Sequence, residues 1–315
     1  MSDWRPTASR ETLERRAQML TAARAFFADR RVLEVDTPML VNAPVTDVHI
    51  HSAQVTLSNA QPCFLHTSPE YGMKRLLAAG SGDIFQICHV VRGYERGRIH
   101  NSEFTLIEWY RTGFSLSQLM SEVGELVRAL LGKPLGSESL TYREAFLRHL
   151  QLDPFTASEE QLIEAAQGLD PGATARDRDL LLDFLMATRV GPHLGENTLT
   201  FVHGYPASQA ALARLDPSDP RAALRFELYS DGVELANGFH ELASAEEQRT
   251  RFENDQVERR RRGLPSYPLD ERLLAALEAG LPDCAGVALG FDRLVMLAVD
   301  ADSIDEVLPF PTERA

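Results

Sequence analysis

Residues 84–111, IFQICHVVRGYERGRIHNSEFTLIEWYR, predict a β-hairpin with a long tip. The runs Ile84 to Val91 and Phe104 to Arg111 are rich in the β-branched and aromatic residues that favour strands. The polar stretch from Gly93 to Asn101 joins them. At a period of two, four side chains of the second run share one face, namely Phe104, Leu106, Glu108 and Tyr110. That face is either a polar pocket for an ammonium group or a strand end that reaches water.

Strands and helices do not alternate strictly on either side of this hairpin. Ser9 to Arg30 has helical periodicity, and Val32 to Val35 precedes Pro38 as a short strand. Ser244 begins a long helix, and Gly286 to Val299 has a strand-turn-helix pattern. This order predicts an α+β fold, in which helices flank a mainly antiparallel sheet.

The middle of the chain is predicted to be helical. Thr141 to Glu144 and Ser158 to Gln161 have the spacing of capping boxes, and Asp177 to Val190 continues the helical pattern. We therefore expect residues 113–197 to form a helical insertion before the later strands. The whole chain, 1–315, is expected to fold as one domain, since 315 residues suffice for a large core.

Composition excludes several classes of protein. The net charge of −14 disfavours broad binding to nucleic acid or anionic membranes. Three widely spaced cysteines favour neither a disulfide framework nor a zinc cage. No apolar run reaches the about 18 residues of a membrane span, and the N-terminus lacks the apolar segment of a signal peptide. We therefore expect a cytoplasmic protein that does not enter a membrane.

The pair Asp231-Gly232 between two strand-like runs predicts a second hairpin. In this register the facing pairs are Tyr229 with Glu234 and Glu227 with Ala236, all four on one face. Glu227 and Glu234 are then diagonal neighbours, roughly 7–8 Å apart at the backbone. Two such carboxylates could hold Mg²⁺ on nucleotide phosphates, or they could be ordinary glutamates on a solvated face.

Arginine placement gives weaker signals. Arg92 ends a strand and Arg293 follows Gly290 closely, so each could bind phosphate or form a surface ion pair. The run Arg259 to Arg262 could bind RNA. It could equally be a solvated helix end, in which Glu258 pairs with Arg262.

Together these segments resemble the three motifs of class II aminoacyl-tRNA synthetases. The matching segments are VLEVDTPML at 32–40, FQICHVVRGYERGRIHNSEFTLIEWY at 85–110 and GVALGFDRLVML at 286–297. Two more segments, HTSPEYGMKRLL at 66–77 and ELANGFHELASAEEQ at 234–248, resemble the lysyl-tRNA synthetase subgroup. The resemblance implies the catalytic core of that class and a homodimer built on the first motif.

Within this subgroup the chain resembles the free-standing (R)-β-lysine ligases of elongation factor P. The similarity covers residues 206–213 and 239–277, and the first motif lies so near the N-terminus that no anticodon-binding domain is expected. The resemblance implies that ATP and Mg²⁺ convert (R)-β-lysine to an adenylate, and that elongation factor P accepts the acyl group on a lysine. The alternatives are a ligase for α-lysine and a non-catalytic regulatory module.

The same resemblance assigns roles to residues. Arg92 would bind the α-phosphate and Arg293 the γ-phosphate, while Glu227 and Glu234 would hold Mg²⁺. The other implied ATP contacts are Gly93, Tyr94, His100, Asn101, Phe104, Leu235 and Gly290. Tyr94 stands where lysyl-tRNA synthetases place an acid, and Glu95 follows it.

For the amino acid, the resemblance implies a pocket rich in acids. Its members would be Ser68, Pro69 and Glu70 for the nearer amino group, and Glu108, Tyr110, Asn237 and Glu241 for the side chain. Ala288 replaces a glycine of lysyl-tRNA synthetases. Its methyl would crowd an α-amino group and favours β-lysine, by about 1–3 kcal/mol.

Overall fold

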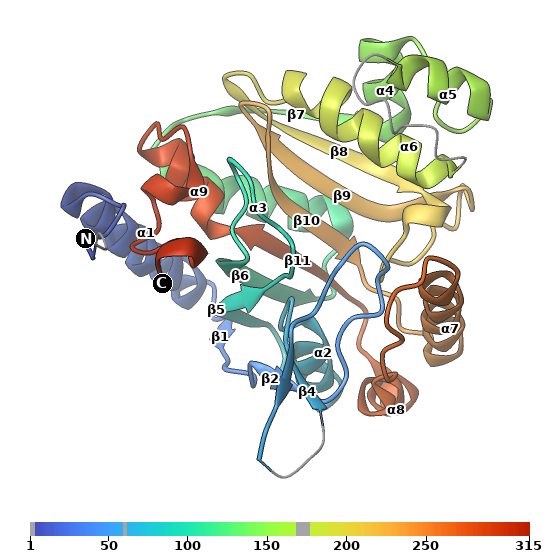
Figure 1. The fold of residues 1–315 in the computed structure, drawn as a ribbon, viewed down its shortest axis with the longest axis horizontal. Helices are drawn as coiled ribbons and strands as arrows, with labels where there is room; N and C mark the ends of the chain where they lie inside the picture. The colour runs from blue at the N-terminus through green and yellow to red at the C-terminus, as the bar shows by residue number, and fades with distance from the viewer. Residues whose placement is uncertain (1–3, 59–61, 168–176) are drawn as a thin grey trace.

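The hairpin at residues 84–111 forms as predicted. In the computed structural model, which describes residues 4–58, 62–167 and 177–315, β5 (Ile84–Val91) pairs antiparallel with β6 (Glu103–Thr112). They lie within an eight-stranded sheet of order β1-β5-β6-β11-β10-β9-β8-β7 (Figure 1). The other strands of this sheet are β1 (Leu33–Glu34), β7 (Gly136–Thr141), β8 (Thr198–Pro206), β9 (Ala222–Ser230), β10 (Val233–His240) and β11 (Cys284–Gly290).

The predicted α+β fold is confirmed. Among the described residues, only the two outer pairs of the large sheet, β1 with β5 and β7 with β8, are parallel. The helices are α1 (Arg10–Asp29), α2 (Glu70–Ala78), α3 (Leu116–Leu131), α4 (Tyr142–Leu150), α5 (Glu159–Ala166), α6 (Arg178–Leu185), α7 (Ala245–Arg261), α8 (Glu271–Gly280) and α9 (Phe291–Ala298). None of the helices in the described residues is long and apolar enough to cross a membrane.

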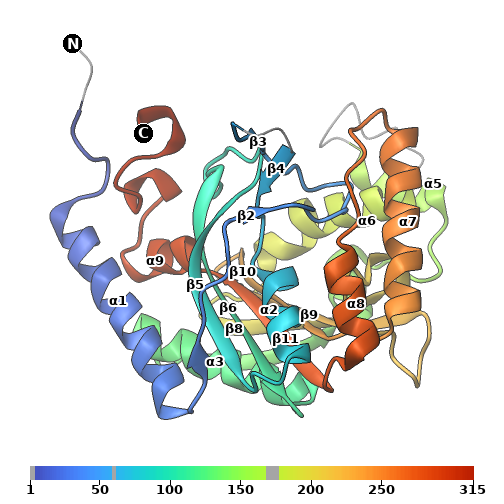
Figure 2. The same cartoon turned by 90° about the horizontal axis from the view of Figure 1, so that it is seen from below.

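Helices α1, α3 and α9 pack together against one face of the sheet and enclose the main core. Trp109 and Phe27 are fully buried there, with their rings 5.3 Å apart. Helices α2, α7 and α8 form a second group, in which α8 packs against both α2 and α7 (Figure 2). Strand β2 is Leu40–Val41. A small sheet of order β2-β4-β3, with β3 (Gln54–Thr56) and β4 (Pro62–Leu65), was not predicted.

Residues 113–197 differ from the predicted helical insertion. Helix α3 belongs to the main core because its buried leucines and valines face the large sheet. Gly136–Thr141 is strand β7, the outermost strand of that sheet, since its backbone groups pair with β8. Helices α4 to α6 form a separate hydrophobic cluster outside β7 and β8, at the top of Figure 1. Residues 168–176 of this segment lie outside the described residues.

Both predicted capping boxes are present. The Thr141 side chain accepts from the backbone N–H of Glu144, whose carboxylate accepts from Thr141 in return. Ser158 and Gln161 make the same reciprocal pair at α5. The predicted helix from 177 is α6, and residues Met186–Val190 continue it as a π-helix.

The second hairpin forms with a register that the sequence did not predict. Asp231 and Gly232 both have positive φ, and Tyr229 faces Glu234 as expected. Beyond that pair the register shifts at a β-bulge, so Glu227 faces Asn237. The prediction that Ala236 shares a face with Glu227 is therefore wrong: the extra residue turns Ala236 toward Leu228 and the main core.

Candidate active site

A cavity of about 810 Å³ lies over β6, β10 and β11. It gathers residues that are far apart in the sequence, since α2, the β5–β6 hairpin and the start of α9 all border it. The predicted site residues that line it are Ser68, Glu70, Arg92, His100, Asn101, Phe104, Glu108, Tyr110, Glu234, Leu235, Asn237, Glu241, Ala288, Gly290 and Arg293. The four side chains expected to share one face of β6 all face this cavity.

Four predicted residues do not line the cavity, namely Pro69, Gly93, Tyr94 and the buried Glu227. Tyr94 is 90% exposed, has a positive φ and lies edge-on to His51. Gly93 donates its N–H to the His51 carbonyl at 2.7 Å. Pro69 is the N-cap of α2 and sets where that helix begins. Glu95, next to Tyr94, does line the cavity.

Arg92 is held at the end of β5 by contacts that leave most of its guanidinium free. Its Nε donates to the Thr67 carbonyl at 3.3 Å, and the guanidinium lies 5.1 Å from the centre of the Phe104 ring. The nearest carboxylate oxygen, on Glu95, is 3.9 Å away. Arg92 can therefore still offer N–H groups to a phosphate or carboxylate in the cavity.

Arg293 is oriented by the loop and hairpin around it. It donates from Nε to the Ile99 carbonyl at 3.3 Å and from Nη1 to the Glu234 carbonyl at 2.9 Å. Its Nη2 lies 2.7 Å from Nε2 of His100. Burial and the charges of Arg293 and Arg92 lower the pKa of His100 to about 4. His100 is thus neutral near pH 7 and accepts this hydrogen bond.

Glu227 and Glu234 lie near each other on β9 and β10. Glu227 is buried and accepts from Arg225 at 2.5 Å and from the Tyr229 hydroxyl at 2.6 Å. Removal from water and the charge of Glu227 raise the pKa of Glu234. Carboxylate oxygens in this arrangement are the hard ligands that Mg²⁺ prefers, so the residues present fit that ion. Arg225 was missed, although a period of two along β9 places it on the same face as Glu227.

The sheet register sets the floor of the cavity. Glu108 on β6 faces Ala288 on β11, Ala288 faces Asn237 on β10, and Asn237 faces Glu227 on β9. One row across four strands thus joins the acid predicted to bind an amino group to an acid predicted to bind metal. Ala288 stands in the middle of this row, where its methyl shapes the space between the two ends.

The end of the cavity next to α2 is acidic and buried. Both oxygens of Glu108 accept hydrogen bonds, from the Ser68 hydroxyl at 2.7 Å and from the Tyr110 hydroxyl at 2.9 Å. Burial, and then the charge of Glu70, raise the pKa of Glu108 to about 8. Burial likewise raises the pKa of Glu241 to about 7, against the opposing charge of Lys74. A cationic ligand would restore the charge of both acids.

Lys74 is a buried residue of this region that the sequence analysis quoted but did not assign. Its Nζ lies 2.7 Å from Glu70 and 2.6 Å from Glu241. The spacing of Glu70 and Lys74, four residues apart on a helix, could have predicted the first contact. The contact with Glu241 depends on the packing of α2 against the end of β10, which local spacing does not reveal.

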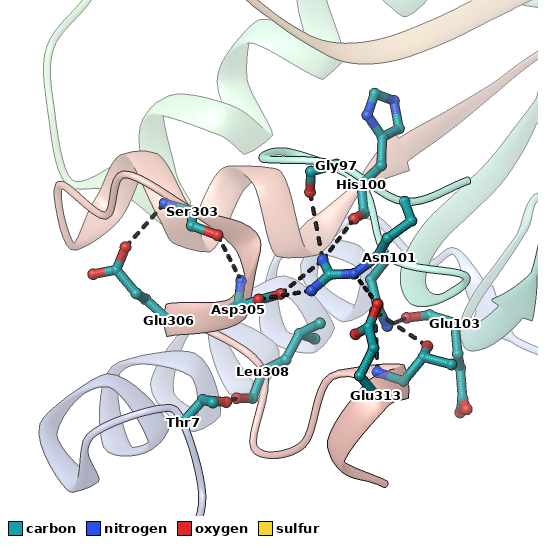
Figure 3. A network of polar contacts seen from close by, with 12 residues as sticks. Thr7, Gly97, His100, Asn101, Glu103, Ser303, Asp305, Glu306, Leu308 and Glu313 are labelled. Carbon is teal, nitrogen blue, oxygen red and sulfur yellow. Dashed lines mark hydrogen bonds and ion pairs between the residues drawn. The ribbon is translucent and has the colours of Figure 1, made fainter. Parts of the chain in front are cut away.

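The tip of the β5–β6 hairpin is fixed by the C-terminal residues (Figure 3). Arg96 pairs with Asp305 at 2.8 Å and with Glu313 at 2.5 Å. The Asn101 oxygen accepts from the backbone N–H and the hydroxyl of Thr312 at 3.2 and 3.1 Å, and its amide donates to the Glu103 carbonyl at 2.6 Å. Asn101 therefore shapes the loop as well as lining the cavity.

The basic run at the end of α7 is only partly a solvated helix end. Arg261 and Arg262 pair with Glu258 at 2.6 Å, as expected for Arg262. Arg259, however, is fully buried: it donates to the carbonyls of Pro265 and Asp47, both at 2.8 Å. It is not available to RNA, because it is buried against Asp47, Pro265 and Tyr267.

Fold and cavity together are those of a class II aminoacyl-tRNA synthetase core. The family model for tRNA synthetases class II (D, K and N) matches residues 1–314, and the chain belongs to this family. The resemblance inferred from the sequence is confirmed at this level.

More particularly, the chain is similar to proteins named elongation factor P–(R)-β-lysine ligase. The protein of that name from Salmonella paratyphi A is 50% identical over an alignment of 321 positions, which covers 99% of this chain and 98% of that protein. The one from Edwardsiella ictaluri is 50% identical over 100% of this chain and 99% of its own. A third, from Klebsiella pneumoniae, is 50% identical over 99% and 98%.

Proposed function

We propose that this protein is an ATP-dependent ligase that activates (R)-β-lysine and transfers it to a lysine side chain of elongation factor P. One observation carries the proposal: a single cavity has Arg92, Arg293 and Glu234 at one end and a buried acidic pocket at the other. A nucleotide and a diamino acid can bind there head to head. The names of the similar proteins supply the substrate and the acceptor.

In the first step, a carboxylate oxygen of β-lysine attacks the α-phosphorus of ATP, the P–O bond to the β-phosphate breaks, and pyrophosphate leaves. Arg92 lies where it can hold both reacting groups, and its charge stabilises the crowded phosphate in the transition state. Arg293, oriented by neutral His100, binds the terminal phosphate. No enzyme nucleophile is needed, since catalysis rests on positioning and charge.

Glu227 and Glu234 would hold Mg²⁺ on the nucleotide. The bound ion would neutralise phosphate charge during adenylate formation. The chain contributes the orientation of these acids: Arg225 and Tyr229 fix Glu227, and strand pairing places Glu234 opposite Tyr229. In the second step, the unprotonated amine of the acceptor lysine attacks the adenylate carbonyl, an amide forms, and AMP leaves.

Intact mass of elongation factor P tests the proposal. After incubation with the enzyme, ATP and (R)-β-lysine, the acceptor should gain one β-lysyl group, and α-lysine should serve as the poorer control substrate. An unchanged mass with β-lysine would refute the proposal, and equal or better incorporation of α-lysine would remove the β-lysine assignment.

Replacement of Glu234 separates an enzyme from a non-catalytic module. Glu234→Ala removes one of the two acids proposed to hold the ion, and we expect β-lysine-dependent ATP–pyrophosphate exchange to fall by about 10²-fold or more. Glu253→Ala, an exposed acid on α7, is the control. Full exchange by the Glu234 variant would show that the metal assignment is wrong.

The organisation of the protein completes the proposal. Residues 1–315 act as one catalytic unit in the cytoplasm, and two copies form a homodimer through the region of β1 and β2. Three large apolar residues are exposed in that region, Leu33, Met39 and Leu40. Covering them in a dimer would bury apolar surface that a monomer leaves in water.

A further inference from the structure

The acidic pocket contains an internal cation that no role has been given. Lys74 is 1% exposed, and its ammonium group bridges two carboxylates of different elements, Glu70 on α2 and Glu241 at the end of β10. Burial alone would lower the pKa of Lys74, but the charges of Glu241 and Glu70 raise it above its ordinary value. The ammonium is therefore permanent at physiological pH.

The pocket around Lys74 has a definite charge balance. Three carboxylates act on one another there, those of Glu70, Glu108 and Glu241, and Lys74 neutralises one of them. The other titratable or charged groups that act on Glu241 are Tyr110, Cys284 and Arg214. Tyr110 and Cys284 stay neutral, because burial raises the pKa of both side chains above the ordinary values. Arg214 uses its guanidinium on Asp283 and on the Glu241 carbonyl.

We propose that Lys74 is a positioning residue that sets the charge of this pocket, so that two carboxylates remain for the two ammonium groups of the substrate. This inference rests on the proposed function, because it takes a diamino acid as the ligand. An isolated carboxylate buried with no partner is costly, so each acid needs a cation or a proton. With Lys74 in place, two carboxylates remain without a cation. A substrate with two ammonium groups supplies one cation for each of them.

Geometry supports a positioning role. Lys74 holds Glu241 from the α2 side, while Gly286 leaves the space that Glu241 and Tyr110 occupy on the sheet side. A Cβ at Gly286 would lie 2.5 Å from the Glu241 carboxylate and 2.3 Å from the Tyr110 ring. Lys74 thus holds the Glu241 carboxylate on one side, and Gly286 leaves room for it on the other, before any ligand binds.

The test is the pH dependence of kcat/KM for (R)-β-lysine, measured by ATP–pyrophosphate exchange. Lys74→Met leaves Glu241 without its cation, which raises the pKa of that acid further. The acid must be ionised to bind ammonium, so the acid limb of the profile should move to higher pH by about one unit or more. Lys74→Arg should keep the limb near the wild-type position. Lys133→Met, at the only other lysine of the chain and half-exposed, is the matched control.

A double variant tests the charge count itself. Lys74→Met with Glu70→Gln removes one cation and one carboxylate together, so the limb should return toward the wild-type pH even if KM rises. Calorimetry in two buffers gives a second measurement: Lys74→Met should release about one more proton on binding β-lysine than the wild type.

Two results would overturn the inference. One is a Lys74→Met profile that has the wild-type shape while the rate falls equally at every pH, which would leave Lys74 a purely structural role. The other is a double variant whose limb stays displaced, and this comparison remains available if Lys74→Met alone does not fold. Absence of β-lysine-dependent exchange in the wild type would instead refute the proposed function.

Discussion

At the scale of single residues, two glycines of β11 border different halves of the cavity. A methyl at Gly286 would overlap Tyr110 and Glu241, whereas at Gly290 it would meet its nearest neighbours, Arg293 and the Leu235 carbonyl, at 3.7 Å. Gly286→Ala should therefore raise KM for β-lysine by about tenfold or more and leave KM for ATP unchanged.

Gly290→Ala is the matched comparison. Its methyl fits the ligand-free protein, so the variant should fold normally and raise KM for ATP alone. Steady-state kinetics with each substrate varied in turn measures both effects. If each variant changed KM for β-lysine and KM for ATP equally, the assignment of one half of the cavity to the amino acid and the other to ATP would be wrong.

The buried acids also predict a pH dependence. Glu108, with a pKa raised to about 8, and Glu241, with a pKa raised to about 7, are protonated below those values and cannot pair with ammonium groups. We expect kcat/KM for β-lysine to rise as pH increases through this range, and Glu108→Gln to flatten the upper part of the rise. KM for ATP, measured at the same pH values, should not follow it.

At the scale of elements, α7 is anchored by its one fully buried arginine. Arg259 satisfies the carbonyls of Pro265 and Asp47, and its guanidinium lies 4.0 Å from the centre of the Tyr267 ring. Arg259→Met should lower the free energy of unfolding by about 3 kcal/mol, because two buried carbonyls lose their donor.

The control for this prediction lies one residue further along the helix. Arg260 is exposed, and Arg260→Met should change the free energy of unfolding by less than about 0.5 kcal/mol. Urea denaturation of both variants provides the comparison. If the two variants were equally stable, the contacts of Arg259 would contribute nothing to the free energy of unfolding.

Elements with strong local signals could be predicted from the sequence. Helix α7 has a capping serine, Ser244, at its start and Gly263 at its end, and both boundaries are confirmed. The bulge at Leu235 could not be predicted, since the Asp-Gly turn fixes only the first pairs of the hairpin. Strands β2 to β4, of two to four residues each, are too short for a period to be visible.

The candidate site followed from several motifs together and not from spacing alone. Arg92, Glu234 and Arg293 each had an ordinary surface interpretation, and only the family resemblance placed them in one cavity. The contact of Lys74 with Glu241 joins residues 167 positions apart through tertiary packing, so no local sequence pattern could predict it.

At the scale of the whole molecule, the proposed dimer gives a direct prediction. Leu40, 42% exposed on β2, would lie in the interface, and Leu40→Asp would place a charge in an apolar contact. We expect this variant to sediment as a monomer at concentrations where the wild type is a dimer. Leu147→Asp on α4, at a leucine that is 40% exposed, is the control and should remain a dimer. A monomeric wild type would contradict the proposal.

The contacts of residues 305–313 with the loop after β5 have one more consequence. The backbone N–H of Thr7 donates to the Pro309 carbonyl, and the Thr7 hydroxyl donates to the Leu308 carbonyl (Figure 3). An exopeptidase that trimmed only residues 312–315 would leave every proposed phosphate and metal ligand intact. It would nevertheless release Asn101 from Thr312 and Arg96 from Glu313, and so loosen the segment that carries His100 toward the nucleotide.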